Sequence, residues 1–186
     1  GQSWRFFEID PAVLDLSRNG TFTYLRDCAP GAQVVLGDAR LKLAQVPEGT
    51  FDLLAVDAFS SDAIPLHLMT DEAMGVYLDA IGPKGILLVH ISNRYIDLEP
   101  VLAAIARKRG LGIAIRDDDT TPNTGSYFTP STWVAIARDP ARIDALRTID
   151  PARSWRGPGP VTARAWTDDH ASILPQVRWG NLLGNH

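Results

Sequence analysis

Short apolar runs alternate with helix-forming segments through the first two thirds of the sequence, and this alternation constrains the fold more than any other feature. The strand-length runs lie at residues 4–9, 33–36, 51–56 and 86–91. The helical segments begin at Pro11 or cover residues 39–45, 70–81 and 98–109, with Thr70 as an N-cap and Gly110 as a C-cap. Strands that alternate with helices predict parallel β-α-β units.

The pattern changes after Gly110. Residues 111–115 and 133–137 have the composition of two strands, and the polar linker between them shows no helix signal. Two strands without an intervening helix are expected to pair antiparallel. A mostly parallel α/β sheet that ends in an antiparallel hairpin resembles the class I S-adenosylmethionine-dependent methyltransferase fold, which is Rossmann-like, more than a dehydrogenase fold. We expect residues 1–186 to form a single catalytic domain.

The composition of the chain limits which classes of partner it can bind and in which cellular compartment it is expected. The chain has 22 acidic and 18 basic residues, a net charge of -4, and no basic stripe, which argues against nucleic acid as a partner. Its only cysteine, Cys28, fits a reducing compartment, and we predict a cytoplasmic location. The longest apolar run is too short to span a bilayer.

Acidic residues lie at the ends of the first three predicted strands. They are Glu8, Asp38 and Asp57, and the run before Asp57 is predicted to be buried on both faces of the sheet. Each acid alone is most simply a turn former. In open parallel sheets, however, the ligand crevice lies beyond the carboxyl ends of the strands, where acids can accept hydrogen bonds from ribose hydroxyls. Three such positions together favour a nucleoside site, in which a third carboxylate such as Asp57 could bind the cationic end of the cofactor or accept a proton from an amine.

The same residues carry a family resemblance. Glu8-Ile-Asp10, Gly37-Asp-Ala39 and the segment 51–57 resemble the spermidine synthase (polyamine aminopropyltransferase) family. The segments 56–65, 90–94 and 166–169 look typical of its bacterial spermidine synthase-like branch, which includes forms fused to membrane transporter segments. The resemblance covers nearly the whole chain.

The resemblance implies a role for each residue of the nucleoside site. Glu8 would bind the ribose hydroxyls, and Ile9 would pack against the adenine. Asp38 would accept a hydrogen bond from the adenine amino group, with Ala39 beside the ring. The co-substrate would be decarboxylated S-adenosylmethionine or S-adenosylmethionine, and no metal would be needed.

The resemblance also implies the reaction, which belongs to polyamine biosynthesis. Asp57 would receive the amine of a small-molecule acceptor and help to deprotonate it, and Tyr127 would line the amine pocket with Asp62 as the second acid. The amine would attack the methylene next to the sulfonium, and methylthioadenosine would leave. The assembly expected from the family is compatible with a homodimer. His90 ends a strand on the same side and could be a base, an amine contact or a partner of a loop backbone.

Two departures from the family keep other functions open. Family members carry two acids three positions apart with a proline after the second, whereas Asp62 stands five positions after Asp57 and Pro65 follows later. Only seven residues precede Glu8, although a Gly-rich loop is expected about 20 residues before the ribose acid. We therefore expect a fragment that lacks the first strand, the Gly-rich turn and the first helix. The alternatives are an S-adenosylmethionine-dependent methyltransferase and a non-catalytic domain that binds a nucleoside or a polyamine.

Overall fold

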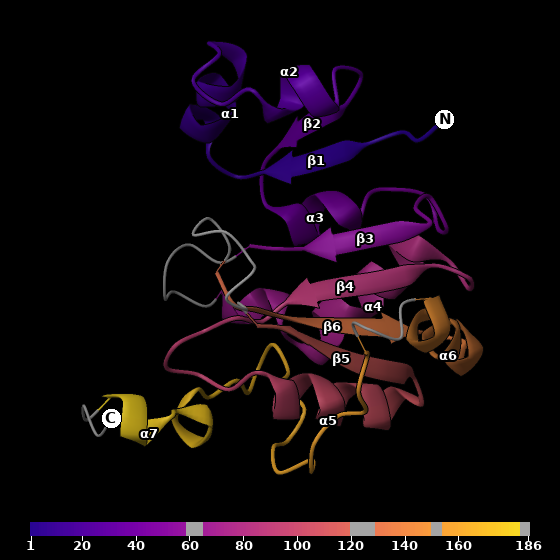
Figure 1. The fold of residues 1–186 in the computed structure, drawn as a ribbon, viewed down its shortest axis with the longest axis vertical. Coiled ribbons are helices and arrows are strands. Elements are labelled where there is room, and N and C mark those ends of the chain that lie inside the picture. Colours follow the sequence, from indigo (N-terminus) through magenta and orange to yellow (C-terminus); the bar gives the residue numbers. More distant parts are fainter. Residues whose placement is uncertain (59–64, 120–128, 150–153, 183–186) are drawn as a thin grey trace. The chain divides into compact units, whose positions relative to one another are not determined.

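The strands that the structure describes fall into two sheets, which belong to two units of the chain (Figure 1). The computed structural model describes residues 1–58, 65–119, 129–149 and 154–182. We call Gly1–Val46 the N-terminal unit and Pro47–His186 the C-terminal unit, and each is described by itself. The expectation that residues 1–186 form one domain stays a prediction.

The N-terminal unit is a β-α-β unit. Strands β1 (Arg5–Glu8) and β2 (Gln33–Leu36) pair in parallel, with Glu8 opposite Leu36. Helices α1 (Pro11–Arg18) and α2 (Tyr24–Cys28) connect the strands, and α3 (Ala39–Leu43) follows β2. Pro11 is the first residue of α1, as predicted, because its fixed φ suits the first turn of a helix and its missing N–H leaves no donor unpaired there.

The C-terminal unit contains a four-stranded mixed sheet in the order β3-β4-β6-β5, with these strands side by side in Figure 1. Strand β3 (Leu53–Val56) pairs in parallel with β4 (Ile86–His90). Strand β6 (Ser131–Ala137) pairs antiparallel with both β4 and β5 (Gly112–Asp118). The predicted fold class, with parallel strands followed by an antiparallel pair, is confirmed.

The described helices of this unit are η1 (Leu66–Leu68), α4 (Asp71–Ile81), α5 (Glu99–Arg109), α6 (Pro140–Ile149), η2 (Leu174–Gln176) and α7 (Trp179–Leu182). Helices α4 and α5 match the predicted segments 70–81 and 98–109 to within one residue. The Thr70 hydroxyl accepts a hydrogen bond from the Ala73 amide at 3.2 Å and caps α4. Gly110 ends α5 with a φ of 67°, a left-handed conformation that glycine adopts without a steric penalty.

The core of the C-terminal unit lies on both faces of its sheet. Alternate residues such as Leu87, Val89 and Ile136 are fully buried on one face. On the other face Ala135 belongs to a cluster closed by Ile143 of α6; the cluster's further members and neighbours are Ala114, Ala137, Ile86, Leu88, Leu146 and Trp155. Helix α4 packs on β3 and β4, and α5 packs on β5 and β6.

The prediction that residues 53–56 are buried on both faces is wrong. Leu54 and Val56 are buried, but Leu53 is 49% exposed and Ala55 is exposed as well. Among the described residues, strand β3 lies at the edge of the four-stranded sheet, where it pairs with β4, and α4 packs against it. An edge strand with one covered face shows the alternation of buried and exposed residues seen here.

Within the described ranges, no helix is both long enough and apolar enough to cross a membrane.

Candidate functional site

The carboxyl ends of β3 and β4 bring Asp57 and His90 together. The two strands run parallel with Val56 opposite Val89, so the next residues of both strands meet on the same face of the sheet. His90 Nδ1 lies 2.7 Å from Asp57 Oδ1, which is the distance of a short hydrogen bond. The Asp57 side chain is 58% exposed, whereas that of His90 is 21% exposed. Asp57 is therefore accessible to a ligand, and the more buried His90 side chain holds it by a hydrogen bond.

The second ring nitrogen of His90 is also engaged. His90 Nε2 lies 2.7 Å from the Ser92 hydroxyl oxygen, and the same oxygen accepts a hydrogen bond from the Thr132 amide at 2.7 Å. The Trp133 ring lies beside the imidazole, with 4.9 Å between ring centroids and 31° between their planes. These contacts link the ends of β3 and β4 to the beginning of β6.

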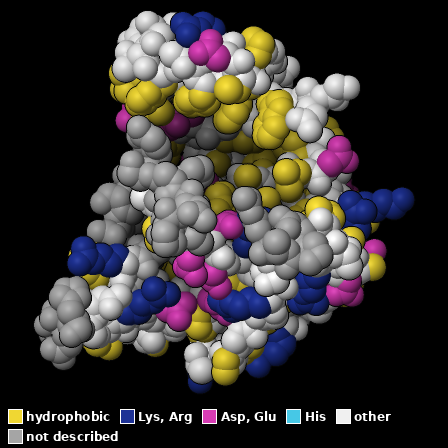
Figure 2. Space-filling view, viewed as in Figure 1, with side chains coloured by type: hydrophobic (Ala, Val, Ile, Leu, Met, Phe, Trp, Pro, Cys, Tyr) yellow, Lys and Arg dark blue, Asp and Glu magenta, His cyan; other side chains and the backbone are white. Residues whose placement is uncertain are grey.

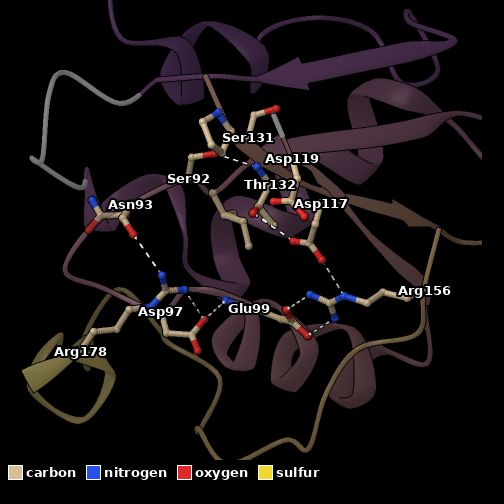
Figure 3. A pocket seen from close by; sticks show the side chains of 12 residues that line it. Ser92, Asn93, Asp97, Glu99, Asp117, Asp119, Ser131, Thr132, Arg156 and Arg178 are labelled. Carbon is tan, nitrogen blue, oxygen red and sulfur yellow. Dashed lines mark hydrogen bonds and ion pairs between the residues drawn. The ribbon is translucent and has the colours of Figure 1, made fainter. Parts of the chain in front are cut away.

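Ser92 also lines a polar pocket of about 450 Å³ at the same end of the sheet (Figure 3). The pocket is lined by Ile91, Ser92, Asn93, Asp97, Glu99, Asp117, Asp119, Pro130, Ser131, Thr132, Arg156 and Arg178. Four of these side chains are acids and two are arginines, so the lining carries a formal charge of about -2 (four negative and two positive groups). Figure 2 likewise shows acidic and basic side chains of the C-terminal unit next to one another on the face in view.

Arg156 joins the acids of this pocket. Its guanidinium donates to both oxygens of Glu99, at 2.9 and 2.7 Å, and to Asp117 at 2.7 Å. The hydrogen bond from Arg156 lowers the pKa of Glu99, which also accepts a hydrogen bond from the Gly159 amide. In return, the hydrogen bonds to Glu99 and Asp117 raise the pKa of Arg156. The network connects α5, β5 and the segment that begins at residue 154.

The two acids predicted for the nucleoside lie at one end of the parallel pair in the N-terminal unit. Glu8 is the last residue of β1, and Asp38 follows β2 by two positions. Glu8 Oε1 accepts a hydrogen bond from the backbone amide of Asp10, two residues further along the chain, at 2.9 Å. Asp38 Oδ1 accepts from Leu41 N at 2.9 Å and caps α3. Both acids thus act as local turn or cap residues, and each carboxylate has a second oxygen.

The remaining predicted residues are placed as follows. Ile9 is 69% exposed, and Ala39 is the first residue of α3. Asp62 and Tyr127 lie outside the described residues. Asp57 and His90 belong to the C-terminal unit, and Glu8 and Asp38 to the N-terminal unit. In the part of the chain that the structure describes, no three His, Cys, Asp or Glu side chains gather in a way that could hold a metal ion.

The sequence pattern did not identify Ser92 or Arg156. Ser92 stands two residues after His90, where a serine in a loop is usually a turn residue. Arg156 lies in a Pro- and Gly-containing segment that looks like surface sequence, and its partner Glu99 is 57 residues away. The position of His90 at the end of a strand was the one available signal for this cluster.

Comparison with known proteins supports the fold. No protein-family model and no curated protein matches the sequence. A probable spermidine synthase from Corynebacterium glutamicum is 13% identical, with a TM-score of 0.58 over 92% of this chain and 74% of that one. A spermidine synthase from Thermotoga maritima is 16% identical, with a TM-score of 0.51 over 75% of this chain and 47% of that one.

A third structure, a spermidine synthase in complex with the transition-state analogue AdoDATO, is 17% identical, with a TM-score of 0.52 over 80% of this chain and 48% of that one. The chain thus spans about half the length of the second and third structures. At these identities the likeness shows the fold alone. The predicted spermidine synthase-like, class I S-adenosylmethionine-transferase fold is confirmed.

Proposed function

We propose that this chain is a spermidine synthase-like transferase that moves an aminopropyl group from decarboxylated S-adenosylmethionine to a small amine. The observation that carries this proposal is the exposed Asp57 carboxylate, which directly follows β3 and is held by His90 of the neighbouring parallel strand. The carboxyl ends of parallel strands border the ligand crevice in open α/β sheets. The likeness of the fold to three spermidine synthases supports the same function.

The reaction requires a carboxylate but little covalent chemistry from the protein. The lone pair of the amine attacks the methylene next to the sulfonium, a C–N bond forms as the C–S bond breaks, and the electron pair of that bond moves to sulfur. Neutral methylthioadenosine leaves, and the product ammonium gives up a proton. Asp57 would accept a hydrogen bond from the attacking amine and then its proton, so that orientation and general-base assistance provide the rate enhancement.

The acids of the N-terminal unit would bind the nucleoside. Glu8 would accept hydrogen bonds from the ribose hydroxyls, and Asp38 would accept one from the adenine amino group. Ile9 exposes an apolar side chain on which an adenine ring could pack, and Ala39 would lie beside the ring. Asp62 and Tyr127 remain predictions for the amine pocket, as do the amine acceptor, the homodimer and the exclusion of nucleic acid as a partner.

A product assay with both forms of the co-substrate tests the proposal. The full chain is incubated with decarboxylated S-adenosylmethionine and a panel of linear diamines, and methylthioadenosine is measured by chromatography. A parallel reaction contains S-adenosylmethionine, and S-adenosylhomocysteine is measured. Amine-dependent release of methylthioadenosine is expected. Formation of S-adenosylhomocysteine alone would indicate a methyltransferase, and calorimetric binding without turnover would indicate a non-catalytic domain; either result overturns the proposal.

A further inference from the structure

We propose that His90 is the positioning residue for Asp57 and that Ser92 fixes the His90 tautomer that this role requires. The inference deepens the proposed function and rests on it, because it assigns to His90 the orientation of the carboxylate that meets the amine. It is carried by the continuous path from the Thr132 amide through Ser92 and His90 to Asp57.

The direction of each hydrogen bond follows from what each group can donate. An ionised carboxylate only accepts, so the hydrogen between Asp57 and His90 belongs to His90 Nδ1. Ser92 already accepts the Thr132 amide, and its single hydroxyl hydrogen is free to point at His90 Nε2. The neutral imidazole therefore carries its hydrogen on Nδ1. In this state His90 binds Asp57 Oδ1, and the second carboxylate oxygen would receive the amine.

Packing holds the imidazole in this orientation. His90 pairs with Trp133 across β4 and β6, and the two rings lie close together. The imidazole is mostly buried, while the carboxylate that it binds is largely exposed. An exposed aspartate on its own samples several rotamers, and a fixed donor beneath it selects one of them. The Asp57 carboxylate is therefore already oriented when the amine binds.

The order Asp57–His90–Ser92 also resembles a hydrolase triad, but the Ser92 environment favours an anchor over a nucleophile. In a triad the serine oxygen faces the substrate carbonyl, and backbone N–H groups are directed at the oxyanion. Here the Thr132 amide donates to the serine oxygen itself and ties it to β6. We therefore expect no labelling of Ser92 by a fluorophosphonate probe, and stoichiometric labelling would contradict its role as an anchor.

The tautomer can be measured directly. Long-range ¹H–¹⁵N correlation spectra of the full chain at alkaline pH report which ring nitrogen of each neutral histidine carries hydrogen. The chain has 4 histidines, and the signals missing from a His90→Asn sample identify those of His90. Hydrogen on Nδ1 is the expected result, and hydrogen on Nε2 would overturn the inference whatever the activity.

Two substitutions separate the contacts on the two sides of the ring. In His90→Asn the amide nitrogen stands on the γ carbon, close to the position of Nδ1, and can still donate to Asp57. In His90→Gln the amide lies one bond further out and reaches toward Ser92 instead. We expect kcat to fall about 10- to 100-fold in His90→Gln, because a misplacement of about 1 Å can cost ~10²-fold. His90→Asn should stay within about fivefold of wild type, the value of one hydrogen bond.

The test also includes a measurement of co-substrate affinity and a control substitution at a second histidine. Calorimetric affinity for decarboxylated S-adenosylmethionine should be unchanged in both variants, and His170→Asn, at an exposed histidine, should leave kcat unchanged. Equal losses in the Asn and Gln variants, or no loss in either, would overturn the role of His90. Absence of transfer by the wild-type chain would instead refute the proposed function, so the two failures are distinguishable.

Discussion

The strand-end acids of the two units are held by different kinds of partner. In the N-terminal unit, Asp38 accepts a hydrogen bond from the backbone of Leu41, three residues away. In the C-terminal unit, Asp57 is bound by the side chain of His90, 33 residues away. The first contact forms wherever α3 forms, whereas the second requires two strands to pair in one register.

A second pair of acids shows the same difference. Glu8 accepts from the amide of Asp10, two residues away, while Glu99 binds Arg156, 57 residues away. Local contacts of the first kind stabilise a turn. Long-range contacts of the second kind connect elements of the fold and orient the acid. These hydrogen bonds of Glu8 and Asp38 therefore lie within their own turns, whereas those of Asp57 and Glu99 come from side chains of other elements.

Replacement of Asp57 should have the largest effect. Asp57→Asn keeps the size of the side chain but removes the base, so kcat/KM for transfer should fall about 10²- to 10⁴-fold. Affinity for the nucleoside should be spared. Steady-state kinetics of methylthioadenosine release measure the loss, and Asp52→Asn at the opposite end of β3 is the matched control. Retained turnover in Asp57→Asn would show that the carboxylate is not the base.

Removal of the ion pair between Arg156 and Glu99 should have the next largest effect, a decrease in the free energy of unfolding. Arg156→Met leaves Glu99, whose side chain is only 16% exposed, without its bidentate donor. Hydrogen bonds to charged groups contribute roughly 1.5–3 kcal/mol, and we expect a decrease of this size in the free energy of unfolding. Urea denaturation measures it, with the exposed Arg142→Met in α6 as the control. Equal stability of the two variants would mean that the pair contributes little.

Low pH should weaken the ion pair between Arg156 and Glu99. The resulting loss of stability should not exceed that caused by Arg156→Met. The hydrogen bond from Arg156 lowers the pKa of Glu99 in the folded chain. Ionised Glu99 therefore stabilises the folded state fully above the ordinary glutamate pKa of about 4.3, and this contribution is lost as the pH falls through the lower folded-state value. Denaturation between about pH 6 and pH 3 should show a steeper loss of stability in wild type than in Glu99→Gln. Parallel curves would contradict the assignment.

The local contact of Asp38 should matter least for stability. Asp38→Ala removes the N-cap of α3 and should cost about 1 kcal/mol, whereas Asp38→Asn keeps a good cap and should cost almost nothing. Thermal or urea denaturation distinguishes the two variants. If Asp38 also binds the adenine amino group, both variants should lose nucleoside affinity. A loss of affinity confined to Asp38→Ala would assign the residue to capping alone.

Much of the fold followed from short-range signals. Thr70 caps α4, Pro11 begins α1 and Gly110 ends α5 where the sequence predicts, because each of these residues acts on the backbone within one helical turn. The antiparallel pairing of β5 and β6 was predictable because the sequence between them carries no helix signal. The exposure of Leu53 was not predictable, because it depends on the position of β3 at the edge of its sheet.

The candidate site divides in the same way. The sequence by itself determined that Glu8, Asp38 and Asp57 lie at the ends of strands, since strand length and apolar pattern are properties of neighbouring residues. Only the tertiary structure decided that Asp57 meets His90 and that Ser92 holds the other side of the imidazole. Those contacts depend on strand register and side-chain direction, because a shift by one residue would turn either side chain to the opposite face.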